Sequence, residues 1–492
     1  MTALPMFIVA PMLLFAFLSI LAGIWRQKLA YIISLAGTGF SLIAAIIGLV
    51  TVIKEGELRY YLGGWPPPIG IEYVLDPLSA FIAVIILFIG LIVLIYPAKA
   101  GLYHIPPKGF PVYGVIMLLL TGLLGVVVTG DLFNLFVFLE IYSLSSYALI
   151  SLGEKRALFA SFRYLILGSI AGSFYLLGVG FIYFSTGSLN MADVARLLPA
   201  IYQSPAILAA AAFITIGLGI KMALFPLHMW LPDAHSYAPP VIAALLASVQ
   251  IEVPAYVLVR MLLNVFPPEY LSHYLPITTI IGWCAAAGII IGSVMAIAQK
   301  DFKRMLAYST VSQISYIGLG IALANPLGFI GALLHILNHA FMKSCLFLAA
   351  GGIRYHTGIR EITWFTGLGR RMPLLMAGFT VAALSMVGIP PTAGFFSKWY
   401  LLRGSIDANN WVFVVVILVS SLLNAVYFFR VIEKVWAHAP PEGVEANIGV
   451  RIKTSPRILF PVLILAAGVI VLGLINAVIV TKVLEQVVIP LR

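Results

Sequence analysis

Charged side chains inside long apolar stretches are the residues of this chain whose chemistry needs an explanation. Glu140 lies nine residues into the apolar stretch that begins at Asp131, and Lys221 lies in another such stretch. A lysine at the centre of a bilayer costs about 2.5–3.5 kcal/mol on insertion scales, so it needs a buried partner or a water-filled cavity. A nearby ammonium stabilises a buried carboxylate, which otherwise keeps its proton. Glu140 and Lys221 therefore predict a pair that loads and releases a proton, with a static pair joining two helices as the alternative.

Three further ionisable residues recur at helical spacing in the stretch GALLHILNHAFMKSCLF. His335, His339 and Lys343 stand at positions i, i+4 and i+8, so they share one face of a helix. Histidine exchanges protons near neutral pH, which predicts a proton path along this face; two hydrogen-bonded structural histidines are the alternative. A zinc-protease helix would have the pattern H-E-x-x-H, and no carboxylate lies between these histidines, so we expect no metal site.

Two of the charged stretches are also interrupted by proline. Pro226 and Pro232 follow Lys221, and the sequence Gly-Ile-Pro-Pro at 388–391 precedes Lys398. Proline ends or kinks a helix, and non-helical backbone at membrane depth persists only where protein or water surrounds it. The two breaks therefore predict positions on an ion path. His228 and His235, which flank the first break, are candidates to carry protons toward the cytoplasmic side or to be structural.

Glu252 is a second carboxylate in mid-span, two residues before Pro254. We expect it to share the neighbourhood of Lys221 with Glu140, and one ammonium cannot fully compensate two buried carboxylates. Such a pair of acids would hold one proton between them or admit a sodium ion. In the alternative, Glu252 turns toward Arg260 and takes no part in transport.

The composition identifies a polytopic membrane protein. Of 492 residues, 62 % are hydrophobic and only 10 % are charged, and the mean hydropathy is +1.07. The net charge of +11 comes without a basic surface interleaved with aromatic residues, so we expect no nucleic-acid partner. The two cysteines, Cys284 and Cys345, have no metal spacing. No motif for a quinone, flavin, haem or iron–sulfur cluster is present, and we expect no cofactor.

Fourteen apolar stretches are long enough to cross a bilayer, one of them split. They lie at 4–24, 30–53, 76–97, 110–129, 131–152, 157–184, 205–225, 237–262, 276–297, 304–324, 327–350, 373–390 with 394–404, 411–436 and 456–481. Alternate loops receive eighteen and seven lysines and arginines, respectively. Because basic loops stay in the cytoplasm, this asymmetry predicts that both termini lie outside. Four basic residues are left at membrane depth: Arg163, Lys221, Lys343 and Lys398.

A weak internal repeat at an offset of about 170 residues organises these stretches. Asp131 corresponds to Asp301, Tyr147 to Tyr316, and PLHMW at 226–230 to FFSKW at 395–399. Five spans in each repeat would invert the second copy in the membrane. We therefore predict three N-terminal helices in 1–109, a first five-helix unit in 110–262, a second five-helix unit in 276–436 and a C-terminal helix in 437–492. Each unit contains one broken helix.

The same residues resemble a known family, the antiporter-like membrane subunits shared by respiratory complex I, multisubunit cation/proton antiporters (their D subunit) and membrane-bound hydrogenases. The resemblance rests on LFNLFVFLEIYSLSSYALI, KMALFPLHMWLPDAHSYAP, DFKRMLAYSTVSQISYIGLG, HILNHAFMKSCLF and GIPPTAGFFSKW. It implies an all-α fold of about fourteen transmembrane helices with two inverted five-helix repeats. It also implies proton transfer along a central axis. One departure is Glu252, because members of this family commonly carry lysine at that position.

These observations predict a proton-translocating subunit of a multisubunit complex in the cell membrane, with no catalytic centre of its own. The predicted relay consists of Glu140, Lys221, His228, His235, Glu252, His335, His339, Lys343 and Lys398. Its expected partners are other membrane subunits, the lipid bilayer, and protons or sodium ions. The driver would be redox chemistry, as in an NADH dehydrogenase or membrane-bound hydrogenase, or cation exchange. The alternatives are a self-sufficient transporter and a structural scaffold.

Overall fold

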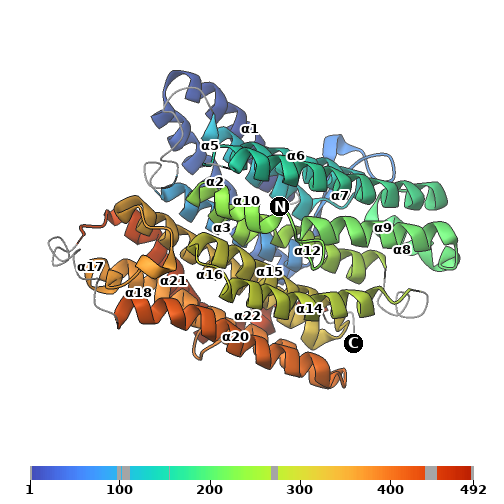
Figure 1. The fold of residues 1–492 in the computed structure, drawn as a ribbon. Coiled ribbons are helices and arrows are strands. Elements are labelled where there is room, and N and C mark those ends of the chain that lie inside the picture. Colours follow the sequence, from blue (N-terminus) through green and yellow to red (C-terminus); the bar gives the residue numbers. More distant parts are fainter. Residues whose placement is uncertain are drawn as a thin grey trace.

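The computed structural model describes residues 3–96, 101, 111–154, 156–266, 275–437 and 452–488. Nearly all of this chain is helical, and the long helices lie side by side along one common direction (Figure 1). The two strands β1 (Leu58–Tyr61) and β2 (Glu72–Leu75) form an antiparallel hairpin. The N-terminal part holds α1 (Leu4–Trp25), α2 (Gln27–Glu55) and α3 (Pro77–Ile95).

The two predicted five-helix units are each built from long and interrupted helices. The first contains α5 (Val112–Val128), α6 (Leu132–Ser151), α7 (Ala157–Thr186), the short α8 (Met191–Leu197), α9 (Pro205–Lys221), α10 (Leu231–Tyr237), α11 (Pro240–Leu245), η3 (Leu246–Gln250), α12 (Glu252–Arg260) and η4 (Met261–Val265). The second contains α14 (Ile277–Ile297), α15 (Phe302–Ala322), α16 (Pro326–Thr357), α18 (Pro373–Val387), α19 (Ala393–Asp407) and α20 (Trp411–Trp436). The C-terminal helix is α21 (Pro456–Leu474).

The helix lengths confirm a polytopic all-α membrane fold. In the described residues, ten helices are long and apolar enough to cross a membrane, and α5, α9 and α18 are shorter apolar helices. The remaining predicted span coincides with α15, whose 21 residues include many hydroxyl side chains. Every predicted stretch thus contains a helix. The count of fourteen membrane crossings stays a prediction.

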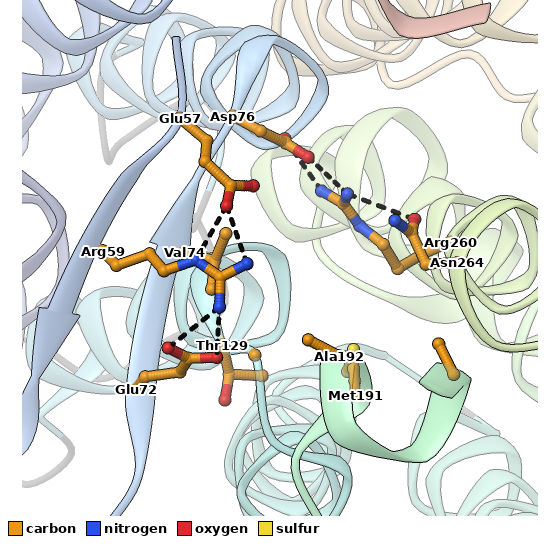
Figure 2. Close-up of a pocket in the computed structure, with 12 residues that line it drawn as sticks. Glu57, Arg59, Glu72, Val74, Asp76, Thr129, Met191, Ala192, Arg260 and Asn264 are labelled. Carbon is orange, nitrogen blue, oxygen red and sulfur yellow. Dashed lines mark hydrogen bonds and ion pairs between the residues drawn. The ribbon is translucent and has the colours of Figure 1, made fainter. Parts of the chain in front are cut away.

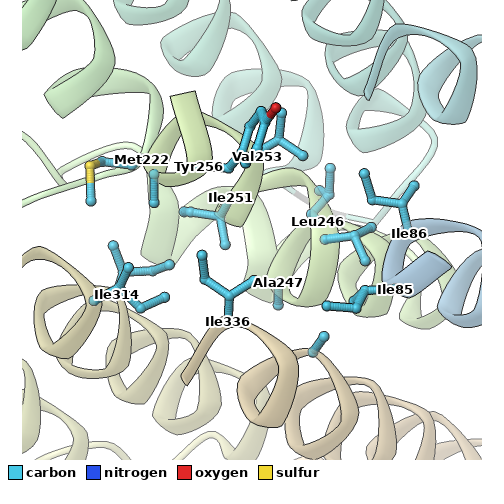
Figure 3. Packing of buried hydrophobic residues seen from close by; sticks show 14 of the residues in the cluster. Ile85, Ile86, Met222, Leu246, Ala247, Ile251, Val253, Tyr256, Ile314 and Ile336 are labelled. Carbon is cyan, nitrogen blue, oxygen red and sulfur yellow. The ribbon is translucent and has the colours of Figure 1, made fainter. Parts of the chain in front are cut away.

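Two membrane-length segments are each buried over at least 18 consecutive residues and form the centre of the bundle. These are 240–265, which runs from α11 through η4, and α16, whereas α7, α20 and α21 leave much of their apolar surface exposed. Ile85, Leu246 and Ile336 belong to the hydrophobic cluster packed between these central helices and α3 (Figure 3). Because the chain passes its two most shielded segments through the centre, ionisable groups on them are held away from lipid.

Both predicted helix breaks are present. The helix α9 ends at Lys221 and α10 begins only at Leu231, while α18 ends at Val387 and α19 begins at Ala393. At the second break, Gly388 has φ +94°, a left-handed conformation that glycine adopts without strain. Carbonyl groups at such helix ends have no partner within the helix, so they are available to other donors.

Matching backbone hydrogen bonds support the internal repeat. Leu132 donates its N–H to the carbonyl of Leu189, and Phe302 donates in the same way to Arg360. The residues on each side of these bonds differ by 170 and 171 positions, respectively. Asp131 and Asp301 both cap the helix that follows, accepting from the backbone N–H of Asn134 and Arg304. The inverted orientation and the unit boundaries stay predictions, and residues 109 and 110 lie outside the described residues.

One ion pair joins the N-terminal helices to the first five-helix unit. Asp76 caps α3 by accepting from the N–H of Ser79, and its carboxylate also contacts the Arg260 guanidinium at 2.5 and 2.9 Å. Burial alone would raise the pKa of Asp76, but the charge and hydrogen bonds of Arg260 and the bonds from Ser79 lower it to about 2. The pair therefore stabilises the fold wherever Asp76 is ionised.

We predict that Asp76→Asn lowers the free energy of unfolding of the detergent-solubilised protein by about 2 kcal/mol at neutral pH. Asparagine keeps the helix cap but loses the charge. Because the folded-state pKa is depressed, this contribution is complete above the ordinary aspartate pKa and is lost as the pH falls toward 2. The measurement is thermal unfolding of this variant beside the control Asp193→Asn. The Asp193–Arg196 pair of the control is exposed, so its loss should change the stability little. Equal losses in both variants would contradict the prediction.

Candidate functional site

The predicted contact between Glu140 and Lys221 is present. The Lys221 ammonium donates to Glu140 Oε1 at 3.2 Å and to the Ser143 hydroxyl at 2.6 Å. Glu140 faces Gly172 of α7, where an added Cβ would lie only 2.6 Å from the carboxylate oxygen. The Lys221 side chain is buried, whereas 27 % of the Glu140 side chain is accessible. The carboxylate can thus exchange a proton with its surroundings while the ammonium stays enclosed.

The first break also supplies the polar backbone around Lys221. Trp230 donates its indole N–H to the carbonyl of Ile220 at 2.9 Å, and its ring stacks on Tyr164 with centroids 3.8 Å apart. The same carbonyl also accepts from the backbone N–H of Ala223 at 3.1 Å, so the end of α9 is closed by both bonds. Lys221 is therefore fixed at a helix C-terminus, where the negative end of the helix dipole favours a cation.

Glu252 pairs with His339, so the expectation that it shares Lys221 with Glu140 is wrong. Its Oε1 lies 2.6 Å from His339 Nδ1, and both side chains are almost completely buried. The alternative contact with Arg260 is also absent from the described residues, because Arg260 pairs with Asp76. A π-helical turn at η3 comes just before Glu252, and the residue that it adds rotates the following side chains about the helix axis. Glu252 consequently points toward α16.

The histidines of α16 extend this contact toward the second break. The rings of His339 and His335 stack with centroids 6.1 Å apart, and His335 Nδ1 lies 2.9 Å from the Ser397 hydroxyl. Tyr316 packs on the other side of His335, with ring centroids 5.5 Å apart. The side-chain nitrogen Nε2 of each histidine is buried and has no hydrogen-bond partner among the described residues. Buried polar atoms normally have partners, so water between these groups is expected.

Lys343 occupies the next turn of the same helix face. Its ammonium donates to the Leu306 carbonyl at 2.9 Å and also to the Ser309 hydroxyl. No carboxylate forms a salt bridge with it in the described part of the chain. The Leu306 carbonyl also accepts from Ser309 and Thr310, so it keeps partners if the lysine is replaced.

Lys398 lies at the second break, as predicted. Its ammonium donates to the carbonyls of Met386 and Val387, at 2.9 and 3.0 Å, and lies 5.1 Å from the centre of the Tyr316 ring. These carbonyls stand at the C-terminal end of α18. The row from Glu252 through His339 and His335 thus continues to Lys398 by way of Tyr316.

The two histidines at the first break have different surroundings. His235 is fully buried, and its ring meets the edges of Trp230 and Phe347 at 6.2 Å. Phe347 is one turn beyond Lys343 on α16, so His235 lies beside the central face. His228 stacks on Phe225 at 5.3 Å, and no contact with Lys221 or Glu140 is found among the described residues. The roles of both histidines in proton transfer stay predictions.

Several polar residues around this row were missed from the sequence. Lys303 was counted as a loop charge, which is wrong: it is buried at the start of α15 and donates to the Ala238 carbonyl at 2.5 Å. The hydroxyls of Ser143, Ser309 and Ser397 hold the buried lysines and His335. The sequence contains a signal for these hydroxyl groups. Ser143 lies one turn after Glu140, and the run LAYSTVSQISY is rich in hydroxyl groups for a membrane span.

Arg163 was expected at membrane depth. Its side chain is 40 % exposed and pairs with Asp233.

Together these contacts form two clusters of ionisable groups. One holds Glu140 and Lys221, and the other runs from Glu252 to Lys398. No group of three or more histidine, cysteine or acidic side chains placed to hold a metal occurs in the described residues. Buried carboxylate, imidazole and ammonium groups in contact can pass protons without any bound cofactor.

A bundle of membrane helices with buried ionisable side chains and two broken helices defines a polytopic membrane protein of the ion-path type. The chain belongs to the NADH:quinone oxidoreductase/Mrp antiporter transmembrane family, whose model matches residues 129–424.

Relatives and solved structures agree on this family. The chain is 50 % identical over 463 residues to the N subunit of the NADH-quinone oxidoreductase of Desulforudis audaxviator, covering 91 % of this chain and 92 % of the relative. It is 32 % identical to the D subunit of the Na(+)/H(+) antiporter of Alkalihalophilus pseudofirmus, covering 88 % and 86 %. A chain of the Mrp complex from Dietzia superposes with a TM-score of 0.88 at 26 % identity, covering 99 % of this chain and 98 % of that one. A chain of the archaeal membrane-bound sulfane sulfur reductase superposes with a TM-score of 0.87 at 31 % identity, covering 98 % and 97 %.

We predict that Lys343→Met slows ion translocation by about tenfold or more, and more than His335→Ala does. Water can replace an imidazole in a proton path, but it cannot replace a fixed positive charge. Translocation by membrane vesicles that contain the assembled complex is the measurement, normalised to the amount of complex. Wild-type rates in both variants would favour a structural role for this face of α16.

We predict that Glu252→Lys lowers translocation although it restores the residue common in the family. It would place a second ammonium against His339 and Lys343 in a buried site with no compensating acid. Glu252→Gln is the matched control, because it keeps a side chain of the same shape that can hydrogen-bond to His339. The pH profile of translocation should change in both variants. An unchanged profile and full activity in Glu252→Lys would show that position 252 does not exchange protons.

Proposed function

We propose that this chain is the proton-translocating subunit of a multisubunit membrane complex. The observation that carries the proposal is the buried row Glu252–His339–His335–Tyr316–Lys398, which crosses from the first five-helix unit into the second. Each neighbour in this row contacts the next by a hydrogen bond, ring packing or a cation–π contact. A static scaffold would not need such a row, because buried charged pairs stabilise a fold no better than apolar packing does.

In the proposed mechanism, Glu140 and Lys221 load protons and the buried row passes them on. When Glu140 takes up a proton, its attraction for the Lys221 ammonium weakens, and the ammonium can turn toward the centre of the bundle. The added positive charge then drives a proton along the row from the Glu252–His339 pair. Lys398, whose side-chain nitrogen rests on the carbonyls of Met386 and Val387, takes up this proton at the far end of the row when it is in its neutral amine form.

We infer that other membrane subunits surround this chain. The accessible fraction of the Glu140 side chain supports this, because a carboxylate that faced lipid at this depth would be costly and requires water or a polypeptide partner. Redox chemistry or cation exchange in those subunits would then drive the charge movement. The named relatives belong to complexes of both kinds.

We propose that the protein lies in the cell membrane and that both of its termini face outside. The excess of lysine and arginine in alternate loops supports this arrangement. The proton is the proposed ion, because the row consists of groups that bind and release protons. A sodium ion on this path would have to enter the region between Lys221 and Glu252. The buried side chains of Met222 and Ile251 lie there and are apolar, which disfavours sodium (Figure 3).

Glu140→Gln tests the proposal. The substitution keeps the shape of the side chain and removes its charge, so translocation should fall by about a hundredfold while the complex still assembles. The matched control is Glu361→Gln, which removes an exposed carboxylate outside the row. Proton uptake by vesicles and the yield of purified complex are measured side by side. A normally assembled Glu140→Gln complex that pumps at the wild-type rate would exclude Glu140 from the path.

A further inference from the structure

A polar pocket opens at the end of the bundle that the charge distribution places outside. It has a volume of about 310 Å³ and lies between the β1–β2 hairpin, the start of α8 and the end of α12. Arg59, Glu72, Asp76 and Arg260 point their charged groups into it (Figure 2). A space of this size holds several water molecules.

The charged groups of the pocket are fixed by one another. Arg59 contacts Glu57 at 2.7 Å and Glu72 at 3.2 Å, and Glu72 also accepts from Asn190 at 2.6 Å. Glu72 is 1 % exposed, so these contacts hold it in one position. The pair of Asp76 and Arg260 forms the side of the pocket toward α12 (Figure 2). The pocket is therefore a preformed, hydrated space.

One face of α12 connects this pocket to the buried row. Glu252, Tyr256 and Arg260 stand at i, i+4 and i+8, and together span about 12 Å along the helix. The Tyr256 hydroxyl donates to the Val127 carbonyl at 2.7 Å and accepts from the Arg260 guanidinium at 2.9 Å. Tyr256 is 2 % exposed and thus separates the pocket from Glu252. Its hydroxyl is the polar group of this face between the two.

We propose that the pocket is the outer vestibule of the proton path, joined to Glu252 through the Tyr256 hydroxyl, so that a proton held at Lys398 returns along the row and leaves here; this rests on the proposed function. The hydroxyl oxygen accepts from Arg260 Nε at 3.2 Å and Nη2 at 2.9 Å, so one of these two bonds opens first. A proton from the Glu252–His339 pair then reaches the freed lone pair through water, as the hydroxyl's own proton turns from Val127 toward the pocket and passes to water. The phenol is unchanged at the end of the step. Three acids, Glu57, Glu72 and Asp76, face two arginines in this pocket, so its net charge is negative and attracts the released proton.

The same geometry selects protons over metal cations. A proton crosses the Tyr256 position by exchange of a hydroxyl hydrogen, whereas a sodium ion would have to pass between Tyr256 and the Arg260 guanidinium. A fixed guanidinium repels a cation in a narrow polar passage. Sodium exchange, where a complex performs it, would then take another route than this vestibule.

Chemical blocking of the vestibule tests the proposal in the assembled complex. Ala192 lines the pocket and is exposed, so Ala192→Cys is introduced in a Cys284→Ser background, with Cys345 left in place because it is fully buried. A membrane-impermeant methanethiosulfonate reagent is added from the predicted outer side. Labelling should slow proton translocation about tenfold, because the reagent fills the water space. Ala408→Cys, an exposed position after α19, is the control and should transport normally when labelled.

Tyr256→Phe provides a second test that removes a single oxygen atom. Translocation should fall about tenfold, since water must then bridge the gap. The control is Tyr183→Phe, where the side chain is 53 % exposed. Uptake of radioactive sodium from the outer side is measured in vesicles that contain the Arg260→Gln variant. This uptake should exceed that of wild-type vesicles.

The outcomes separate this proposal from the proposed function. Failure of the reagent to reach Ala192→Cys from outside, or full transport by the labelled protein, overturns the vestibule. If the vestibule test fails but Glu140→Gln is inactive in the same vesicles, Glu140 still lies on the proton path. The protons then leave the chain at a place other than this pocket. If Glu140→Gln also transports normally, the proposed function itself is wrong.

Discussion

An ammonium group inside a membrane must be surrounded by oxygen atoms, and the structure depends on this requirement. Lys398 rests on the carbonyls at the end of α18, and Lys303 on the carbonyl that follows α10. Lys343 uses a carbonyl and a hydroxyl of α15, and Lys221 uses Ser143 with the carboxylate of Glu140. The broken helices therefore have an electrostatic function, because continuous helices consume nearly all of their carbonyls internally. Weak, mostly neutral ligands also leave each ammonium free to respond when a neighbouring charge changes.

The carboxylate of Glu252 sets the charge at the centre of the molecule. The lysine that the family resemblance implies at this position would instead place a positive charge beside His339, one turn from Lys343. Glutamate forms a buried pair with His339, and we propose that this pair accepts and releases one proton. The segment 240–265 is buried over at least 18 residues with glutamate at this position, so the acid lies within closely packed protein.

Much of this architecture follows from the sequence because membrane helices obey simple rules. Apolar length located the helices, proline and glycine located both breaks, and the spacing of His335, His339 and Lys343 identified the face that contacts Glu252. The partner of Glu252 could not be predicted, because the π-helical turn before it depends on packing between helices. The buried position of Lys303 was missed for a related reason: its carbonyl acceptor at Ala238 belongs to a helix end distant in sequence.

Polar contacts between the two five-helix units have a mechanical consequence. Glu154 accepts from Arg354 and Arg360, Asp233 pairs with Arg304, and Lys303 binds Ala238. Rocking of one unit against the other, as an alternating-access transporter requires, would break these contacts together. These contacts link the two predicted units at several points and so favour movement of side chains and water over movement of whole units. We therefore expect the speed of transport to depend on how often water enters the apolar segments between the polar clusters.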